Sequence, residues 1–147
     1  MSDNLGFLLG DVARLLRCAF DERAREIGVT RAQWKTLVVL SRNEGSNQGT
    51  LADLLEIEPI TLARMIDRLE EAGLVERRRD PADRRAWRLH LTAAAQPLMI
   101  QLRAIGDTLL EDVLAGISPA GRDGLHATLE HLRSNLNTPN FKEAANG

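Results

Sequence analysis

The sequence predicts a mainly α-helical protein with one short β-hairpin, an α+β arrangement in which residues 1–137 form a single domain. Two observations predict this class. Through most of the chain, apolar residues recur every three or four positions, which is the spacing of an amphipathic helix. Between residues 73 and 92 the pattern changes to alternation around the turn Asp80-Pro81-Ala82-Asp83, which is typical of two strands joined by a turn.

The first predicted helix covers residues 5–27 and ends at Gly28, because glycine readily adopts the left-handed backbone that closes many helices. Its apolar stripe is broad and comprises Leu5, Leu8, Leu9, Val12, Leu15, Leu16, Ala19, Phe20 and Ile27. We interpret its charged residues as a solvated surface with ion pairs one turn apart: Asp11, Arg14, Arg17, Asp21, Glu22, Arg23, Arg25 and Glu26.

The second predicted helix, residues 30–42, begins with Thr30 as its capping residue. Its inward residues are Trp34, Leu37, Val38 and Leu40. The Gly-, Ser- and Asn-rich segment 43–49 then forms a loop, which leaves open a small extra strand beside the hairpin.

Residues 50–72 form two predicted helices separated by a sharp turn. The first, 50–56, stops before Pro59, because a residue that precedes proline avoids the α-helical region. Pro59 suits the first position of the second helix, which ends at Gly73. Helical spacing places Leu62, Ile66 and Leu69 on one face for burial. On a neighbouring face the same spacing gathers Thr61, Arg64 and Arg68.

The hairpin carries a local excess of positive charge, with arginines on both sides of its turn: Arg77, Arg78, Arg79, Arg84, Arg85 and Arg88. Trp87, Leu89 and Leu91 alternate with polar residues, so we expect the second strand to be half-buried. An arginine-rich tip is costly to bury and suits contact with phosphate.

Two more helices are predicted, 93–116 and 118–136, followed by a flexible tail at 138–147. Pro97 lies near the start of the first, and Ser118 with Pro119 opens the second. Segments 5–28 and 93–137 carry more apolar surface than the central unit 30–92 can cover. We therefore expect a second copy of the chain to cover it, which makes these segments dimerisation helices of a homodimer.

Bulk composition narrows the class of protein. The net charge is −2 at pH 7, so a nucleic-acid-binding surface has to come from local charge. A single cysteine, Cys18, excludes an intramolecular disulfide and fits a reducing compartment. No apolar run approaches the ~18 residues of a membrane span and no signal-peptide pattern is present, so we expect a cytoplasmic protein without a membrane partner.

A helix, a sharp turn, a second helix and a basic hairpin are the parts of a winged helix-turn-helix. A helix fits the major groove of double-stranded DNA, where Thr61 can contact a base edge or a phosphate and Arg64 can fork onto guanine. Arg68 has two uses open to it, a DNA phosphate or an ion pair with Asp67 or Glu71.

The hairpin tip can reach the adjacent minor groove. We expect Arg85 to enter that groove and Asp83 to hold the turn. Arg84 would contact phosphate or the groove edge. Arg77, Arg78 and Arg79 would position the protein through the DNA backbone and would not read its sequence. These expectations make residues 59–72 a recognition helix and residues 77–88 an arginine wing.

The order of these parts resembles the MarR family of bacterial transcription regulators. The resemblance covers roughly residues 5–136, and its most specific part is a wing signature of Asp83, Arg85, Leu91 and Thr92. DRRAWRLHLT, AAAQPLM and GISPA look most like the SlyA branch. One departure concerns the start of the second helix: many relatives place a proline immediately before the residue ahead of the Ser/Thr, whereas here Pro59 is followed by Ile60 and then Thr61.

The resemblance implies a homodimer with interleaved terminal helices that reads a pseudo-palindromic operator, as a repressor or an activator. It also places Arg17 and Trp34 where SlyA-like relatives form a pocket for aromatic carboxylates, whose binding would release DNA. The alternative for these two residues is a surface arginine and a core tryptophan. Some relatives sense oxidants through a cysteine, but we interpret Cys18 as a buried structural thiol.

The sequence leaves two other classes of function open. A winged helix also serves as a protein–protein interaction module, and a Cys18 redox switch would be a regulator of another kind. An enzyme is not expected, because the three histidines are scattered and neither a phosphate-binding glycine loop nor a nucleophile elbow is present. The sequence accordingly predicts no cofactor, no metal site and no catalytic residue.

Overall fold

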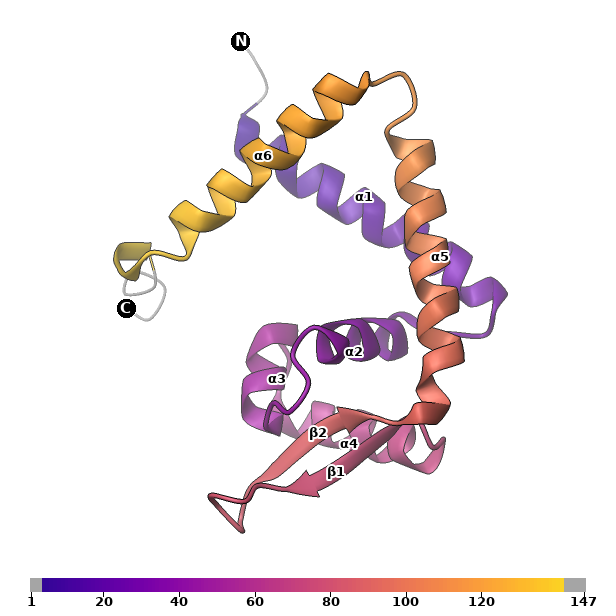
Figure 1. Ribbon diagram of the computed structural model, residues 1–147, viewed down its shortest axis with the longest axis vertical. Helices are drawn as coiled ribbons and strands as arrows, with labels where there is room; N and C mark the ends of the chain where they lie inside the picture. The colour runs from indigo at the N-terminus through magenta and orange to yellow at the C-terminus, as the bar shows by residue number, and fades with distance from the viewer. Residues whose placement is uncertain (1–3, 142–147) are drawn as a thin grey trace. The chain divides into compact units, whose positions relative to one another are not determined.

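The computed structural model describes residues 4–141 and confirms a mainly helical protein with one two-stranded antiparallel sheet (Figure 1). Its elements are α1 (Leu5–Glu26), α2 (Arg31–Ser41), α3 (Gln48–Leu55), α4 (Pro59–Glu71), β1 (Val75–Arg79), β2 (Trp87–Leu91), η1 (Ala93–Ala95), α5 (Gln96–Val113) and α6 (Pro119–Leu136). The chain forms two units, one up to Leu109 and one from Leu110, which we describe separately. None of the helices in the described part is long and apolar enough to span a bilayer.

The helix boundaries near the N-terminus follow from capping. Gly28, which follows the C-cap residue Ile27 of α1, has a φ of 79°, the left-handed conformation that glycine adopts without strain. The Thr30 hydroxyl accepts the Gln33 backbone N–H at 3.2 Å, and the Gln33 side chain accepts the Thr30 N–H at 2.9 Å. This reciprocal capping box fixes the start of α2 where the sequence predicts it.

The prediction that Asp21 of α1 is a solvated surface charge is wrong. Its side chain is only 13% exposed and accepts hydrogen bonds from Trp34 Nε1 at 2.6 Å and Arg31 Nε at 2.5 Å. The Trp34 ring also packs on Phe20, with ring centroids 4.5 Å apart. Asp21 is therefore a polar anchor between α1 and α2.

The helix-turn-helix begins earlier than predicted. The Asn47 side chain accepts the Thr50 backbone N–H at 2.8 Å, so α3 starts at Gln48 and not at Thr50. The turn contains Glu56 with a φ of 55°, a left-handed conformation that usually favours glycine. Pro59 then opens α4 as expected.

The loop before α3 does pair with the hairpin, which the sequence left open. Gly45 N–H donates to the Leu89 carbonyl at 2.9 Å, and Leu89 N–H donates to the Ser46 carbonyl at 2.9 Å. Asn47 also forms an isolated bridge with Arg88. The loop thus braces β2 through a few bonds without becoming a regular strand.

One hydrophobic core holds the first unit together. Its fully buried large side chains come from α2, α3, α4, α5 and both strands of the hairpin: Leu37, Leu40, Leu51, Leu62, Ile66, Leu69, Val75, Leu89 and Leu102. At Gly106 of α5 an added Cβ would lie 3.6 Å from the Phe20 ring, so α1 and α5 approach closely there. The core fixes α4 and the hairpin on one scaffold.

The second unit contains the end of α5 and the helix α6. Ser118 caps α6 by accepting the Gly121 N–H at 3.1 Å. Arg122 closes the preceding turn by donating to the carbonyls of Leu114 and Ile117, each at 3.1 Å. No residue of α6 is buried. The predicted tail 138–147 has helical backbone at 139–141, while residues 142–147 lie outside the described residues.

The Asp21 anchor predicts a pH-dependent stability. Burial alone would raise the pKa of Asp21, but the hydrogen bonds from Arg31 and Trp34 outweigh it and bring the pKa below the ordinary 3.8. A lowered pKa means that the carboxylate stabilises the fold above the ordinary value and that this contribution disappears as the pH falls through the folded-state pKa. We expect Asp21→Asn to lower the free energy of unfolding by about 1–3 kcal/mol at neutral pH.

Urea denaturation of both proteins between about pH 7 and pH 3 tests this expectation, with the difference narrowing toward the acid end. Glu22→Gln is the matched control, because Glu22 is an exposed neighbour on the same helix. A constant difference across this range would show that the Asp21 charge is not what matters.

Candidate nucleic-acid interface

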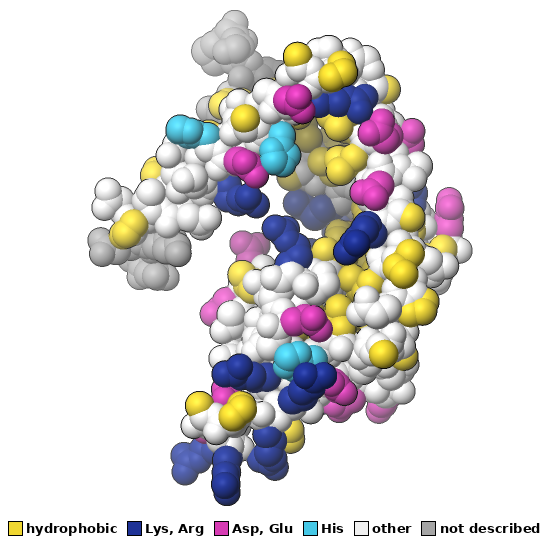
Figure 2. All heavy atoms as spheres, viewed as in Figure 1, with side chains coloured by type: hydrophobic (Ala, Val, Ile, Leu, Met, Phe, Trp, Pro, Cys, Tyr) yellow, Lys and Arg dark blue, Asp and Glu magenta, His cyan; other side chains and the backbone are white. Residues whose placement is uncertain are grey.

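Positive charge concentrates at the far end of the β1–β2 hairpin, residues 75–91. We call this whole hairpin the wing; it contains the predicted arginine segment 77–88. Figure 2 shows Lys and Arg side chains gathered there, away from the helices of the same unit. Two Asx turns shape this end: Asp80 Oδ1 accepts the Ala82 N–H at 2.9 Å, and Asp83 Oδ1 accepts the Arg85 N–H at 3.0 Å. The turn therefore holds the backbone of Arg84 and Arg85 in a defined shape.

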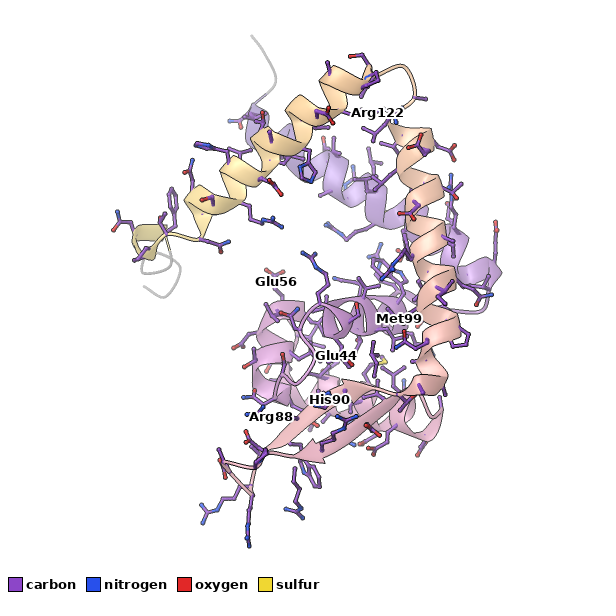
Figure 3. All side chains as sticks on the ribbon, in the orientation of Figure 1. Glu44, Glu56, Arg88, His90, Met99 and Arg122 are labelled. Carbon is purple, nitrogen blue, oxygen red and sulfur yellow. The ribbon has the colours of Figure 1, made fainter. Side chains whose placement is uncertain are left out.

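Four of the six wing arginines are engaged inside the chain. Arg78 pairs with Glu76, with Nε 2.6 Å from Oε1. Arg88, on β2 (Figure 3), pairs with Asp80 at 3.2 Å. Arg79 donates to the Arg84 carbonyl at 2.8 Å, and its guanidinium carbon lies 4.7 Å from the centre of the Trp87 ring. Arg77 is the fourth.

These contacts reduce the electrostatic repulsion between two neighbouring arginines of the hairpin. Arg78 and Arg88 lie directly opposite each other in the antiparallel register, and like charges at such positions destabilise a hairpin. Glu76 and Asp80 each neutralise one of them. The Ala82 N–H and then the Arg88 guanidinium also keep the pKa of Asp80 below its usual value.

Arg77 connects the wing to α4. Its side chain is only 17% exposed, and its guanidinium lies 2.7 Å from Asp67 Oδ1 and 3.0 Å from Glu70 Oε1. Its Nε also donates to Gln48 Oε1 of α3 at 3.0 Å. The register explains this position, because Arg77 pairs with the buried Leu89 and so shares the inner face of the hairpin.

Arg84 and Arg85 differ from the other four. Both are exposed, and within residues 4–141 neither guanidinium has a hydrogen-bond or ion-pair partner. The structure therefore sorts the predicted wing residues into two groups. Arg77 is bonded inside the unit, while the tip arginines and the turn-forming Asp83 present their charges to solvent.

The outer face of α4 carries the predicted recognition residues. Thr61, Arg64 and Arg68 are exposed and make no side-chain hydrogen bond or ion pair in the described part of the chain. The opposite face buries Leu62, Ile66 and Leu69 in the core. Of the two uses open to Arg68, the structure shows no pairing with Asp67, which is bound to Arg77.

The predicted ligand residues lie apart from these groups. Trp34 is half-buried with its indole N–H bonded to Asp21, whereas Arg17 is exposed on α1. Within residues 4–141 no hydrogen bond or ring contact joins the two. A shallow hollow of about 540 Å³ lies instead between the wing and the neighbouring helices, lined by Gln48, Glu70, Arg77 and Trp87.

The interpretation of Cys18 as a buried thiol is wrong for the single chain. Its side chain is exposed on α1, and Arg31 Nη2 lies 3.8 Å from its Sγ. The apolar spacing of α1 does not reveal this, because it describes a stripe without saying what covers it. A redox role for this residue stays a prediction.

Comparison with known proteins agrees with this geometry. Residues 29–87 match the model of the MarR family. The transcriptional regulator PA3341 has 34% sequence identity and a TM-score of 0.77, over 90% of this chain and 98% of its own. A MarR transcriptional regulator from Methanosarcina mazei Go1 has 28% identity and a TM-score of 0.76, over 89% of this chain and 94% of its own.

A third similar structure is a MarR family transcriptional regulator from Listeria monocytogenes, complexed with 26mer DNA. It has 26% identity and a TM-score of 0.74, over 92% of this chain and 90% of its own. The family match spans the helix-turn-helix and most of the wing, and the structural matches span nearly the whole chain. This chain belongs to the MarR family of winged-helix transcription regulators.

Proposed function

We propose that the protein is a homodimeric regulator that binds double-stranded DNA, with α4 in the major groove and the wing tip at the minor groove. The observation that carries the proposal is the division of the wing arginines. Four are bonded inside the unit, and the two at the tip carry no partner in the described residues. An exposed, unpaired pair of arginines on a shaped turn suits a polyanion.

On α4, the proposal assigns base reading to Thr61 and Arg64. Residues near the start of a recognition helix contact base edges, and arginine can donate two hydrogen bonds to guanine. Arg68, one turn further along the same face, would contact phosphate. The pairing of Asp67 and Glu70 with Arg77 supports this orientation, because it offsets carboxylates that would otherwise repel DNA.

In the wing, the proposal places Arg85 in the minor groove and Arg84 on phosphate or the groove edge. The Asp83 turn supports this by fixing the backbone that carries both residues. Arg77 would act on DNA indirectly, by holding the wing against α4.

The homodimer is supported by apolar side chains that the single chain leaves exposed. On α1 these are Leu5, Phe7, Leu8, Leu9, Val12 and Leu15, and on α6 they are Leu125, Leu129 and Leu136. Contiguous exposed apolar surface usually marks an interface. A symmetric pair would present two α4 helices to a pseudo-palindromic site, with half-sites about one helical turn apart.

Finer assignments are also part of the proposal. The segments that resemble the SlyA branch favour that branch and a cytoplasmic bacterial regulator. An aromatic carboxylate effector would stack on Trp34 through its ring face, because the indole N–H is already bonded to Asp21, while Arg17 would bind the carboxylate. Its binding would shift the spacing of the α4 helices.

The first experiment measures binding to the DNA upstream of the protein's own gene at several salt concentrations. We expect Arg85→Ala to weaken binding by about 1–3 kcal/mol and to reduce the salt slope by about one. Arg78→Ala is the matched control, because it removes the same charge from the same hairpin but from an existing ion pair. Equal losses in both variants would mean that net charge alone matters.

A second experiment tests the indirect role of Arg77. We expect Arg77→Ala to lower the free energy of unfolding by about 1–3 kcal/mol, because several charged hydrogen bonds disappear. DNA affinity should fall roughly tenfold, because Asp67 and Glu70 lose their counter-charge. Adding Asp67→Asn and Glu70→Gln should then recover affinity. If Arg77 itself contacts DNA, the triple variant will bind as weakly as the single one.

A third experiment tests the dimer by light scattering. We expect Leu129→Glu to convert the protein from dimer to monomer, because a charge would enter an apolar interface. Ser134→Glu provides the control on the opposite side of α6 and should stay dimeric. Circular dichroism checks that both variants keep their helices. A wild-type protein that is already monomeric would contradict the proposal.

A further inference from the structure

One apolar side chain stands among the polar residues of the α4 outer face. Ile60 is 64% exposed and follows Pro59 in the first turn of the helix. Counting about 100° per residue, it lies nearly opposite the buried face of α4 and within about 40° of Arg64. Ile60 and Arg64 thus form successive steps of one ridge.

The surroundings of Ile60 differ from those of the exposed leucines on α1 and α6. Those leucines repeat along apolar stripes that a second copy of the chain would cover. The residues that share the outer face with Ile60 are polar: Thr61, Arg64, Asp67, Arg68 and Glu71. A partner that binds this face of α4 therefore has to present a small apolar group to Ile60 and polar groups to the residues around it.

The major groove of DNA offers such a group. Thymine is the base that presents a C5 methyl there, beside acceptors and donors that arginine and threonine can bind. A β-branched side chain is also stiff in a helix, so Ile60 presents its methyl groups in one defined direction. We infer that Ile60 reads the C5 methyl of a thymine in each half-site, next to the base that Arg64 contacts.

This inference rests on the proposed function, since it requires α4 in the major groove. It assigns Ile60 to specificity, because contact with one methyl group distinguishes thymine from cytosine without adding charge. The two exposed apolar residues just before α4, Leu54 and Ile57, belong to α3 and the turn and not to the outer face of α4. They are therefore exposed apolar residues near Ile60 that can serve as controls for it.

The test uses the full-length protein and duplexes selected from a random DNA pool. Each thymine of the selected site is replaced in turn by deoxyuridine, which removes only the methyl group. For the wild type we expect one position per half-site at which the replacement weakens binding about fourfold, the effect of losing one buried methyl contact. At other thymines the replacement should have no effect.

The same series is then measured with Ile60→Ala and, as the matched control, Ile57→Ala. Alanine keeps the helix, and Ile60 is exposed, so the variant should fold. With Ile60→Ala the effect of deoxyuridine at the sensitive position should vanish, while Ile57→Ala should keep it. The inference is supported if only Ile60→Ala abolishes the effect of deoxyuridine at that position.

Other outcomes overturn it in distinguishable ways. If the wild type selects a site and binds with a steep salt dependence, but no thymine methyl couples to Ile60, this inference fails and the proposed function stands. Ile60 would then face a different surface, such as a protein. If the wild type selects no site and binds without salt dependence, both the inference and the proposed function fail.

Discussion

The organisation of the proposed DNA-binding surface depends on the contact of the Arg77 guanidinium with α3 and α4. A cation with a side chain only 17% exposed requires acceptors, and Asp67, Glu70 and Gln48 supply them from two different helices. The same contact joins the wing to α4. It also offsets two of the three acidic residues that α4 would otherwise present to a phosphate backbone.

Around this contact the charges divide into those that build the unit and those that remain for a partner. The Arg78–Glu76 and Arg88–Asp80 pairs keep the hairpin together despite its crowded cations. Arg84 and Arg85 at the tip, with Arg64 and Arg68 on α4, stay exposed. The net charge of −2 hides this arrangement, since it averages over acids elsewhere in the chain.

Local rules were enough to predict the fold class and most element boundaries. Gly28, Thr30, Pro59 and Gly73 each act within a few residues, so their roles are readable from neighbouring positions. The start of α3 was missed because Asn47 is as good a cap as Thr50. The anchor at Asp21 was missed because its partners belong to another helix, and helical spacing does not identify partners. Arg77 and Leu89 share a face by strand alternation, a signal that could have shown Arg77 turning inward.

The position of Arg77 ties the order of the wing to the sign of the charge on α4. By itself α4 has two arginines against three acids, so its formal charge is −1, and Arg77 raises the balance to zero. A molecule whose wing has locally unfolded would therefore also lose the charge neutrality of α4. If α4 binds in the major groove as proposed, such partly unfolded molecules would be repelled from DNA, so local unfolding would shorten residence on DNA well before the core opens.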